Sequence, residues 1–229
     1  MVMRPDFGLS NLGEPVVHTV HLRSTSHARL YRRLFKRVLD VGLVALALPI
    51  ILPVVLILAF LIALDGGSPL FRQNRLGLGG KVFMMMKLRT MQVDAEARLR
   101  EYLAHDHRAQ AEWDAFQKLD NDPRVTRIGL FLRRSSLDEL PQLWNVLTGD
   151  MSLVGPRPML PEQRDLYIGG AYYTLRPGVT GLWQVSDRNK STFARRADFD
   201  TDYERNLSFA TDIRVLAATV SVVLHCTGK

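Results

Sequence analysis

The stretch VGLVALALPIILPVVLILAFLIAL, from Val41 to Leu64, decides the fold because its 24 residues carry no charge. As one straight helix it would be roughly 36 Å long, enough to cross a hydrocarbon core of about 30 Å. Globular cores rarely need such a run, so the stretch predicts a membrane contact. About forty residues precede it and no small-residue cleavage site follows. We therefore expect it to stay in the mature protein rather than act as a cleavable signal peptide.

Two prolines inside the run argue against a simple span. Pro49 and Pro53 lie four residues apart on one helical face, so their bends add and favour a break near the middle. Basic residues flank both ends of the run: Arg32, Arg33, Lys36, Arg37, Arg72, Arg75, Lys81 and Lys87. The positive-inside rule then places both flanks in the cytoplasm. The sequence predicts a re-entrant helix-break-helix hairpin over residues 31–65, with a kinked spanning helix as the alternative.

Composition limits the class of protein and partner. A length of 229 residues with 47% hydrophobic residues is typical of one folded domain and excludes a disordered, collagen-like or rod-like chain. A net charge of +7 favours nucleic acid, anionic lipid or phosphorylated metabolites as partners. The single cysteine, Cys226, excludes an internal disulfide and a cysteine-based zinc site, and it indicates a reducing compartment.

The rest of the chain predicts helices with a few strands. Residues 1–30 are polar without a sustained period, which indicates a flexible tail. The strand formers in 69–75 and 81–90 surround LGLGG and predict a β-hairpin whose glycines form a turn rather than a phosphate loop. Residues 92–118 predict a surface helix or a pair of helices. Asp212 to Leu224 predicts an amphipathic helix that either lies on the membrane or packs on the core.

The densest chemical pattern is DPRVTRIGLFLRRSSLDELPQLWNVLTGDMSLVGPRP, from Asp122 to Pro158. Its adjacent carboxylates, Asp138 and Glu139, precede an apolar helical pattern that Pro141 begins. A carboxylate at the positive end of a helix stays ionised, binds Mg²⁺ and can attack an electrophilic phosphorus. Helix capping by the same residues is the structural alternative.

Several arginines favour an anionic ligand beside this carboxylate pair. They lie near turns or helix ends rather than along a solvated face: Arg133, Arg134, Arg157 and Arg176. Arg157 stands between two prolines with locked φ angles, so its guanidinium starts with little backbone freedom and can grip a phosphate through two hydrogen bonds. An arginine in a surface turn is the alternative reading. Carboxylates and arginines together indicate phosphoryl transfer.

Taken in order, these motifs resemble the bacterial sugar transferases that load a polyprenol phosphate with a hexose 1-phosphate, the monotopic phosphoglycosyl transferases. The resemblance covers roughly Leu30 to Lys229. It passes through FKRVLD, FRQNRLG, KLRTM, DPRVTRIG, SLDELPQLWNVLTGDMSLVGPRP and RPGVTGLWQVSDRN. So many motifs in one order make a specific match. The chain looks most like the short form that initiates exopolysaccharide repeat units.

The resemblance implies an activity and assigns residues to it. Asp138 would attack the sugar-bearing phosphate of a UDP-hexose of galactose or glucose type, release UMP and carry a covalent phosphosugar, which polyprenol (undecaprenyl) phosphate then accepts. Glu139, with Asp138, would hold Mg²⁺ or assist proton movement. Phosphate binding is expected from Lys87, Arg89, Arg157 and Arg176. Pro53 matches the helix-breaking proline of the family.

The resemblance also implies a fold and a location. We expect a helix-rich α+β protein, membrane-monotopic, whose small cytoplasmic catalytic domain over residues 66–229 lies on the bacterial inner membrane. Membrane lipids are then partners, and nucleic acid is not expected because the basic residues are spread along motifs and flank the apolar run. The sequence leaves the hexose and homo-oligomerisation open.

Two positions depart from the family pattern. Leu52 stands where members often carry serine before the breaking proline, and Asp187 stands where a glycine is usual. The first departure removes a side-chain donor for the carbonyl that the proline frees, and the second places a charge beside Arg188. An inactive membrane-anchored scaffold is therefore the alternative from a different class.

Overall fold

The computed structural model describes residues 30–116, 119, 122–186, 193 and 195–224. Residues 1–29 of the predicted flexible tail, and Asp187, lie outside the described residues. Within the described ranges the chain is helix-rich with two small sheets, so the expected α+β class is confirmed. The division of the chain into a tail (1–30), a membrane hairpin (31–65) and a catalytic domain (66–229) stays a prediction.

The elements follow one another in short steps. The first part of the chain contains a π-helical turn Tyr31–Phe35, helix α2 Lys36–Ala63, strands β1 Leu70–Leu76 and β2 Val82–Leu88, and helices α3 Ala95–His105 and α4 His107–Phe116. The middle contains α5 Arg127–Ser135, a 3₁₀ turn Leu137–Glu139, α6 Gln142–Thr148 and β3 Ser152–Val154. The last part contains a 3₁₀ segment Pro161–Leu166, α7 Ala171–Thr174, β4 Gly178–Thr180, α8 Leu182–Val185, α9 Arg196–Arg205 and α10 Phe209–Leu224.

The predicted hairpin and helix pair are both present. Strands β1 and β2 pair antiparallel, with Leu70 opposite Leu88 and Leu76 opposite Val82. Between them Gly79 and Gly80 have positive φ angles of 68° and 75°, so the glycine-rich segment is a turn as expected. The second sheet is a short parallel pair, β3 with β4, in which Ser152 lies opposite Gly178.

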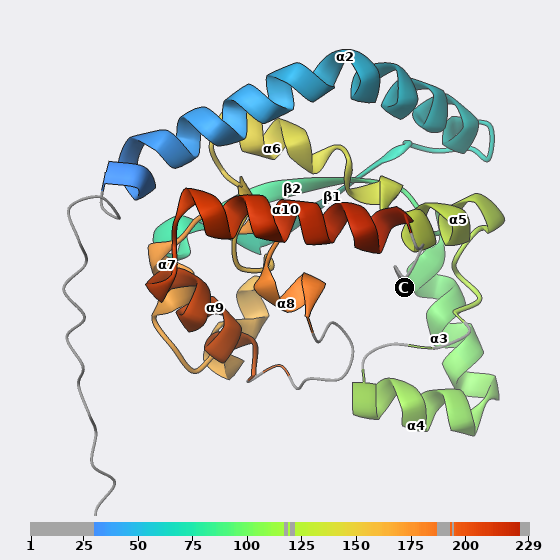
Figure 1. The fold of residues 1–229 in the computed structure, drawn as a ribbon. Helices are drawn as coiled ribbons and strands as arrows, with labels where there is room; N and C mark the ends of the chain where they lie inside the picture. Colours follow the sequence, from blue (N-terminus) through green and yellow to red (C-terminus); the bar gives the residue numbers. More distant parts are fainter. Residues whose placement is uncertain (1–29, 117–118, 120–121, 187–192, 194, 225–229) are drawn as a thin grey trace, which may run out of the picture.

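Helix α2 is the described helix that is long and apolar enough to cross a membrane. Only 6% of its most apolar 18-residue window is buried, whereas the core helix of a soluble protein would be mostly buried. The expected break near the prolines is absent, because the helix continues through Pro49 and Pro53. It curves instead, as an arch that crosses above α6 (Figure 1). Proline removes single hydrogen bonds and kinks a helix without ending it. The re-entrant path through a membrane stays a prediction.

Polar contacts fix the beginning of α2 to the body of the protein. The Lys36 ammonium lies 2.8 Å from the Asp212 carboxylate of α10. The Asp40 carboxylate accepts a hydrogen bond of 2.7 Å from the Ser152 hydroxyl and one of 3.2 Å from the Leu153 N–H. These groups are buried, and burying charged groups is tolerated when they are paired and hydrogen-bonded.

The far end of α2 contacts the same body. Ile62 is 3% exposed and packs with Leu88 of β2 and Leu132 of α5. The Arg89 guanidinium donates a 2.9 Å hydrogen bond to the Ile62 carbonyl, which belongs to the last turn of the helix. Between these attachments apolar side chains point outward, with Leu46 77% and Ile50 74% exposed. Both ends of the apolar helix are therefore attached to one body.

The C-terminal helix α10 packs on the core through one face. Val215 is 2% exposed within a cluster that includes Tyr31, Val154 and Leu207. The Asp212 carboxylate accepts hydrogen bonds of 2.6 Å from each of the Tyr31 and Tyr203 hydroxyls. Of the two expectations for this helix, packing on the core is confirmed. Its contact with a membrane stays a prediction.

Close packing between α5 and the chain after β2 gives a test of the fold. A Cβ atom added at Gly129 would lie 2.0 Å from the Thr90 carbonyl oxygen, whereas one at Gly42 of α2 meets nothing within 4 Å. We expect Gly129→Ala to lower the free energy of unfolding by about 1–3 kcal/mol, because backbone must move. Gly42→Ala should leave it unchanged or raise it. Thermal unfolding of both variants in one detergent measures the difference, and equal midpoints would contradict this packing.

Candidate active site

A strained turn positions the carboxylate pair. Ser136 has a φ of 57°, the one positive φ at a non-glycine residue in the described ranges. Helix α5 ends there, and the turn Leu137–Glu139 follows before α6 begins at Gln142. A side chain in this left-handed region costs of order 1 kcal/mol, and such strain is concentrated at functional sites. The reversal brings Asp138 inward, where it is 8% exposed.

Helix capping does not account for the pair. Ser136 makes no side-chain capping hydrogen bond at this turn, and the residue that precedes α6 is Pro141, which has no side-chain acceptor. The expectation that Pro141 marks the start of the helix is confirmed. The alternative of helix capping is wrong, because neither turn start has a side-chain capping hydrogen bond, and Glu139 is instead paired with Lys87 of the hairpin.

Strand β2 supplies the cation that faces both carboxylates. The Lys87 ammonium donates a 2.8 Å hydrogen bond to Oε1 of Glu139 and lies 3.8 Å from Oδ2 of Asp138. The side chains of all three residues are at most 21% exposed, so water screens these charges weakly. The sequence placed Lys87 and Asp138 in separate motifs, and the fold brings them together.

The pKa of the Asp138 carboxyl lies above its usual value of 3.8. Burial is the largest cause, because it disfavours the charged form, and the neighbouring Glu139 charge raises the pKa further. The charges of Lys87 and Arg133 act in the opposite direction. A more basic carboxylate is a stronger nucleophile once ionised, and Lys87 keeps the ionised form accessible.

The Gly155–Pro158 segment brings Arg157 to the same place. Its Nη2 lies 3.8 Å from Oε1 of Glu139. The segment is held by the second sheet, where a Cβ atom on Gly178 would lie 2.1 Å from the Gly155 nitrogen, so only glycine fits. The proline-flanked arginine therefore extends from a closely packed crossing of two loops.

A small cavity lies beside the carboxylates. Its lining includes Arg75, Lys87, Glu139, Gln142 and Arg157. Sequence reasoning counted Arg75 only among the basic residues that flank the apolar run and gave it no role in a site, although it stands in the quoted FRQNRLG motif. Burial, and then the charge of Arg157, lowers the pKa of Arg75 to about 10. Burial and the like charge of Arg157 both disfavour the charged form of Arg75. An anion in this cavity would stabilise that charge, so the cavity attracts anions.

The other two expected phosphate-binding residues lie elsewhere. Arg89 hydrogen-bonds to the Ile62 carbonyl at the end of α2. Arg176 donates a 2.9 Å hydrogen bond to the Gly149 carbonyl, just past the end of α6 that is farther from the carboxylate pair. Both arginines satisfy carbonyls at helix ends. Phosphate binding by either residue stays a prediction, and Lys87 and Arg157 are the two that the fold groups with Asp138 and Glu139.

Asp138 and Glu139 are suited to bind a metal ion whose remaining ligands are oxygens of the substrate. No group of three or more histidine, cysteine or acidic side chains gathers in the parts of the chain that the structure describes. Mg²⁺, however, commonly binds through one or two carboxylates together with substrate phosphates. Asp138 and Glu139 offer that set of hard oxygen donors.

Comparison with known proteins assigns the chain to a family. Residues 31–226 match the family described as bacterial sugar transferase. The chain is 45% identical over 203 residues to the UDP-galactose-lipid carrier transferase of Erwinia amylovora, covering 88% of this chain and 42% of that protein. It is 42% identical over 197 residues to the exopolysaccharide production protein ExoY of Rhizobium meliloti, covering 85% of this chain and 87% of that protein.

A third relative is the UDP-glucose:undecaprenyl-phosphate glucose-1-phosphate transferase of Caulobacter vibrioides, 41% identical over 202 residues, with 83% of this chain and 70% of that protein covered. The chain spans about two fifths of the length of the Erwinia relative and most of the length of ExoY. The matched region contains the apolar helix, both carboxylates and the two arginines of the cavity. The chain belongs to the bacterial sugar transferase family.

Proposed function

We propose that the protein transfers a hexose 1-phosphate from a UDP-hexose of galactose or glucose type to polyprenol (undecaprenyl) phosphate and releases UMP, as the first step of exopolysaccharide synthesis. The observation that carries the proposal is the pair Asp138 and Glu139 beside Lys87 and Arg157. The names of the relatives support it, because they include a UDP-galactose-lipid carrier transferase and a UDP-glucose:undecaprenyl-phosphate glucose-1-phosphate transferase.

The first half-reaction uses Asp138 as the nucleophile. A carboxylate oxygen attacks the sugar-bearing phosphorus, and the bond from that phosphorus to the bridging oxygen of UMP breaks. UMP leaves with the electron pair, and the hexose phosphate stays on Asp138 as an acyl phosphate. Lys87, Arg157 and Arg75 surround the cavity in which the diphosphate charge would lie, so they stabilise the charge that develops there.

The second half-reaction restores the carboxylate. A phosphate oxygen of polyprenol phosphate attacks the same phosphorus, and the bond to Asp138 breaks. The products are the polyprenol-linked diphosphate hexose and free Asp138. We assign Mg²⁺ to Asp138 and Glu139, where the bound ion would neutralise charge on the phosphate oxygens.

The membrane location follows from α2. A spanning helix would carry its two ends to opposite faces of a bilayer, yet Lys36 and Ile62 both contact the catalytic body. We therefore propose that α2 enters one leaflet and returns, with the body on the cytoplasmic face of the bacterial inner membrane. That arrangement brings the polyprenol phosphate head group and the soluble UDP-hexose to one surface. Membrane lipids are then partners of α2.

Replacement of the nucleophile tests the proposed chemistry. We expect Asp138→Asn to lower UMP release from UDP-hexose and polyprenol phosphate by at least about 1,000-fold, because an amide does not attack phosphorus. Covalent labelling of the protein by the radiolabelled phosphosugar should disappear. Asp150→Asn, at an exposed carboxylate beyond α6, is the matched control and should keep both signals. Normal labelling of Asp138→Asn would remove Asp138 from the mechanism.

The electrostatics of Asp138 predict a pH dependence. Only the ionised carboxylate attacks, so kcat/KM should fall as the pH drops through the raised pKa of Asp138. The acid limb should therefore lie above the value of 3.8 for an ordinary aspartate. Lys87→Met removes the charge that lowers this pKa, so the limb should move to higher pH. Lys81→Met, an exposed lysine beside β2, should leave it in place. An unmoved limb in Lys87→Met would contradict the assignment.

Cysteine accessibility tests the path of α2. In a Cys226→Ser background, Leu34→Cys and Asp65→Cys place one thiol at each exposed end of the helix. A membrane-impermeant maleimide should label both thiols in inverted vesicles and neither in intact cells, because both ends lie on the cytoplasmic face. Labelling of one position from each side would establish a spanning helix.

A further inference from the structure

Gln142 is a buried polar side chain that none of the steps proposed above uses. It is the first residue of α6 and is 2% exposed, whereas glutamine side chains are mostly exposed in proteins. Among the described residues its side-chain amide has no hydrogen-bond partner. Burying an amide without a partner costs free energy. Packing therefore does not account for a glutamine at this position.

The Gln142 amide opens onto the catalytic cavity, which Gln142 lines together with Lys87 and Glu139. The fully enclosed polar atoms that lack a partner in the described ranges do not include those of this amide, so the amide reaches open space. The backbone stays right-handed from the carboxylate turn through Pro141 into α6. Residues three and four apart are neighbours on such a surface, so Gln142 lies beside Glu139 and Asp138.

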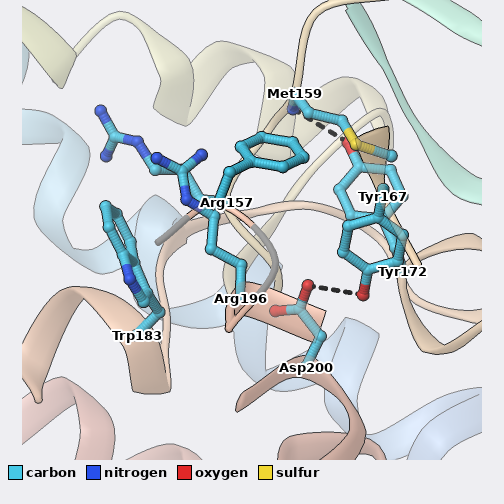
Figure 2. Close-up of a pocket in the computed structure, with 8 residues that line it drawn as sticks. Arg157, Met159, Tyr167, Tyr172, Trp183, Arg196 and Asp200 are labelled. Atoms are coloured by element: carbon cyan, nitrogen blue, oxygen red, sulfur yellow. Dashed lines mark hydrogen bonds between the residues drawn. The ribbon is translucent and has the colours of Figure 1, made fainter. Parts of the chain in front are cut away.

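The size of the cavity decides which part of a ligand reaches Gln142. Its volume is about 30 Å³, and one water molecule needs about 10–15 Å³. The space therefore admits oxygens of one phosphoryl group and excludes a sugar ring or a base. A neighbouring cavity beyond Arg157, lined by Trp183, Tyr167 and Asp200 (Figure 2), has a volume of only about 10 Å³. The rings of a nucleotide sugar must lie outside both cavities.

The charges around the catalytic cavity favour an anion inside it. Of the residues that line it, Arg75, Lys87 and Arg157 are cationic and Glu139 is anionic. Phosphoryl oxygens accept hydrogen bonds, and the Gln142 amide nitrogen can donate two. Hydrogen bonds to a charged oxygen are stronger than those to a neutral one. A phosphoryl group is therefore the ligand chemistry that satisfies the unpaired amide.

We propose that the Gln142 side-chain amide donates a hydrogen bond to an oxygen of the phosphoryl group that is transferred, the one that bears the hexose. The inference rests on the proposed function, because it takes the phosphorus that Asp138 attacks as its fixed point. The hydrogen bond holds this group beside the nucleophile while the hexose and the uridine lie outside the cavity. Gln142 is thus a substrate-binding residue rather than a structural one.

Gln142→Met keeps the length of the side chain and removes its amide. Because the amide has no partner among the described residues, the thermal midpoint of the full-length protein in lipid nanodiscs should stay unchanged or rise. A lower midpoint would contradict the proposal, because it would mean that the protein itself pairs the amide. Gln110→Met is the matched control, since Gln110 of α4 donates a 2.8 Å hydrogen bond to Asp114 away from the cavity.

Binding is then measured by calorimetry without turnover, in the Asp138→Asn background. Gln142→Met should raise the Kd of UDP-galactose or UDP-glucose at least about tenfold, the effect of losing a hydrogen bond to a charged group. The Kd of UMP, which lacks the transferred phosphoryl group, should change less than about twofold, and Gln110→Met should change neither Kd by more than that. Gln142→Glu, which places a negative charge there, should weaken UDP-hexose binding as well.

An unchanged Kd for the UDP-hexose in both Gln142 variants would overturn the proposal. A parallel rise in the Kd of UMP would also overturn it, because the hydrogen bond would then belong to the other phosphate. If the wild type released no UMP and the Asp138→Asn protein bound neither UDP-sugar, the proposed function would fail. Pyrophosphate would then probe the cavity: weaker binding to Gln142→Met than to the wild type would support the phosphoryl contact, and equal binding would overturn it.

Discussion

The attachment of both ends of one apolar helix to a single body is the constraint on which the architecture depends. At the first end, buried Lys36 pairs with Asp212 and buried Asp40 accepts a hydrogen bond from Ser152. Moving the helix away would leave these buried charges without partners. At the other end Ile62 is packed in the core and its carbonyl accepts from Arg89. The outward apolar surface between them is left for lipid. Helix α2 curves as an arch over the body beneath it (Figure 1).

The site contains buried charged groups, each of which would be unfavourable without the others. Asp138 and Glu139 repel each other and are desolvated, while Arg75 and Arg157 repel each other across the neighbouring cavity. Lys87 lies between the carboxylates and relieves part of that repulsion. A diphosphate would add negative charge beside both arginines. The free site is thus preorganised for a negatively charged ligand.

Much of this arrangement could be predicted from the sequence because it is local. The hairpin, the helix pair at 92–118 and the start of α6 after Pro141 follow from turn glycines, period and proline position. The break in α2 was overestimated, since a proline bends a helix without ending it when the flanking turns remain paired. Arg89 and Arg176 donate hydrogen bonds to carbonyls at helix ends away from the carboxylate pair. The sequence does not show which carbonyl each guanidinium contacts, so these positions could not be predicted. Trp183 stands in the quoted motif RPGVTGLWQVSDRN but was given no role, and Asp200 lies outside every quoted motif. Only the fold brings these two residues close to Arg157.

The end of strand β2 connects membrane and chemistry within three residues. Lys87 touches the carboxylates, Leu88 packs under Ile62, and Arg89 ties the last turn of α2. A displacement of the last turn of α2 is therefore only two residues along the chain from the lysine that contacts the nucleophile.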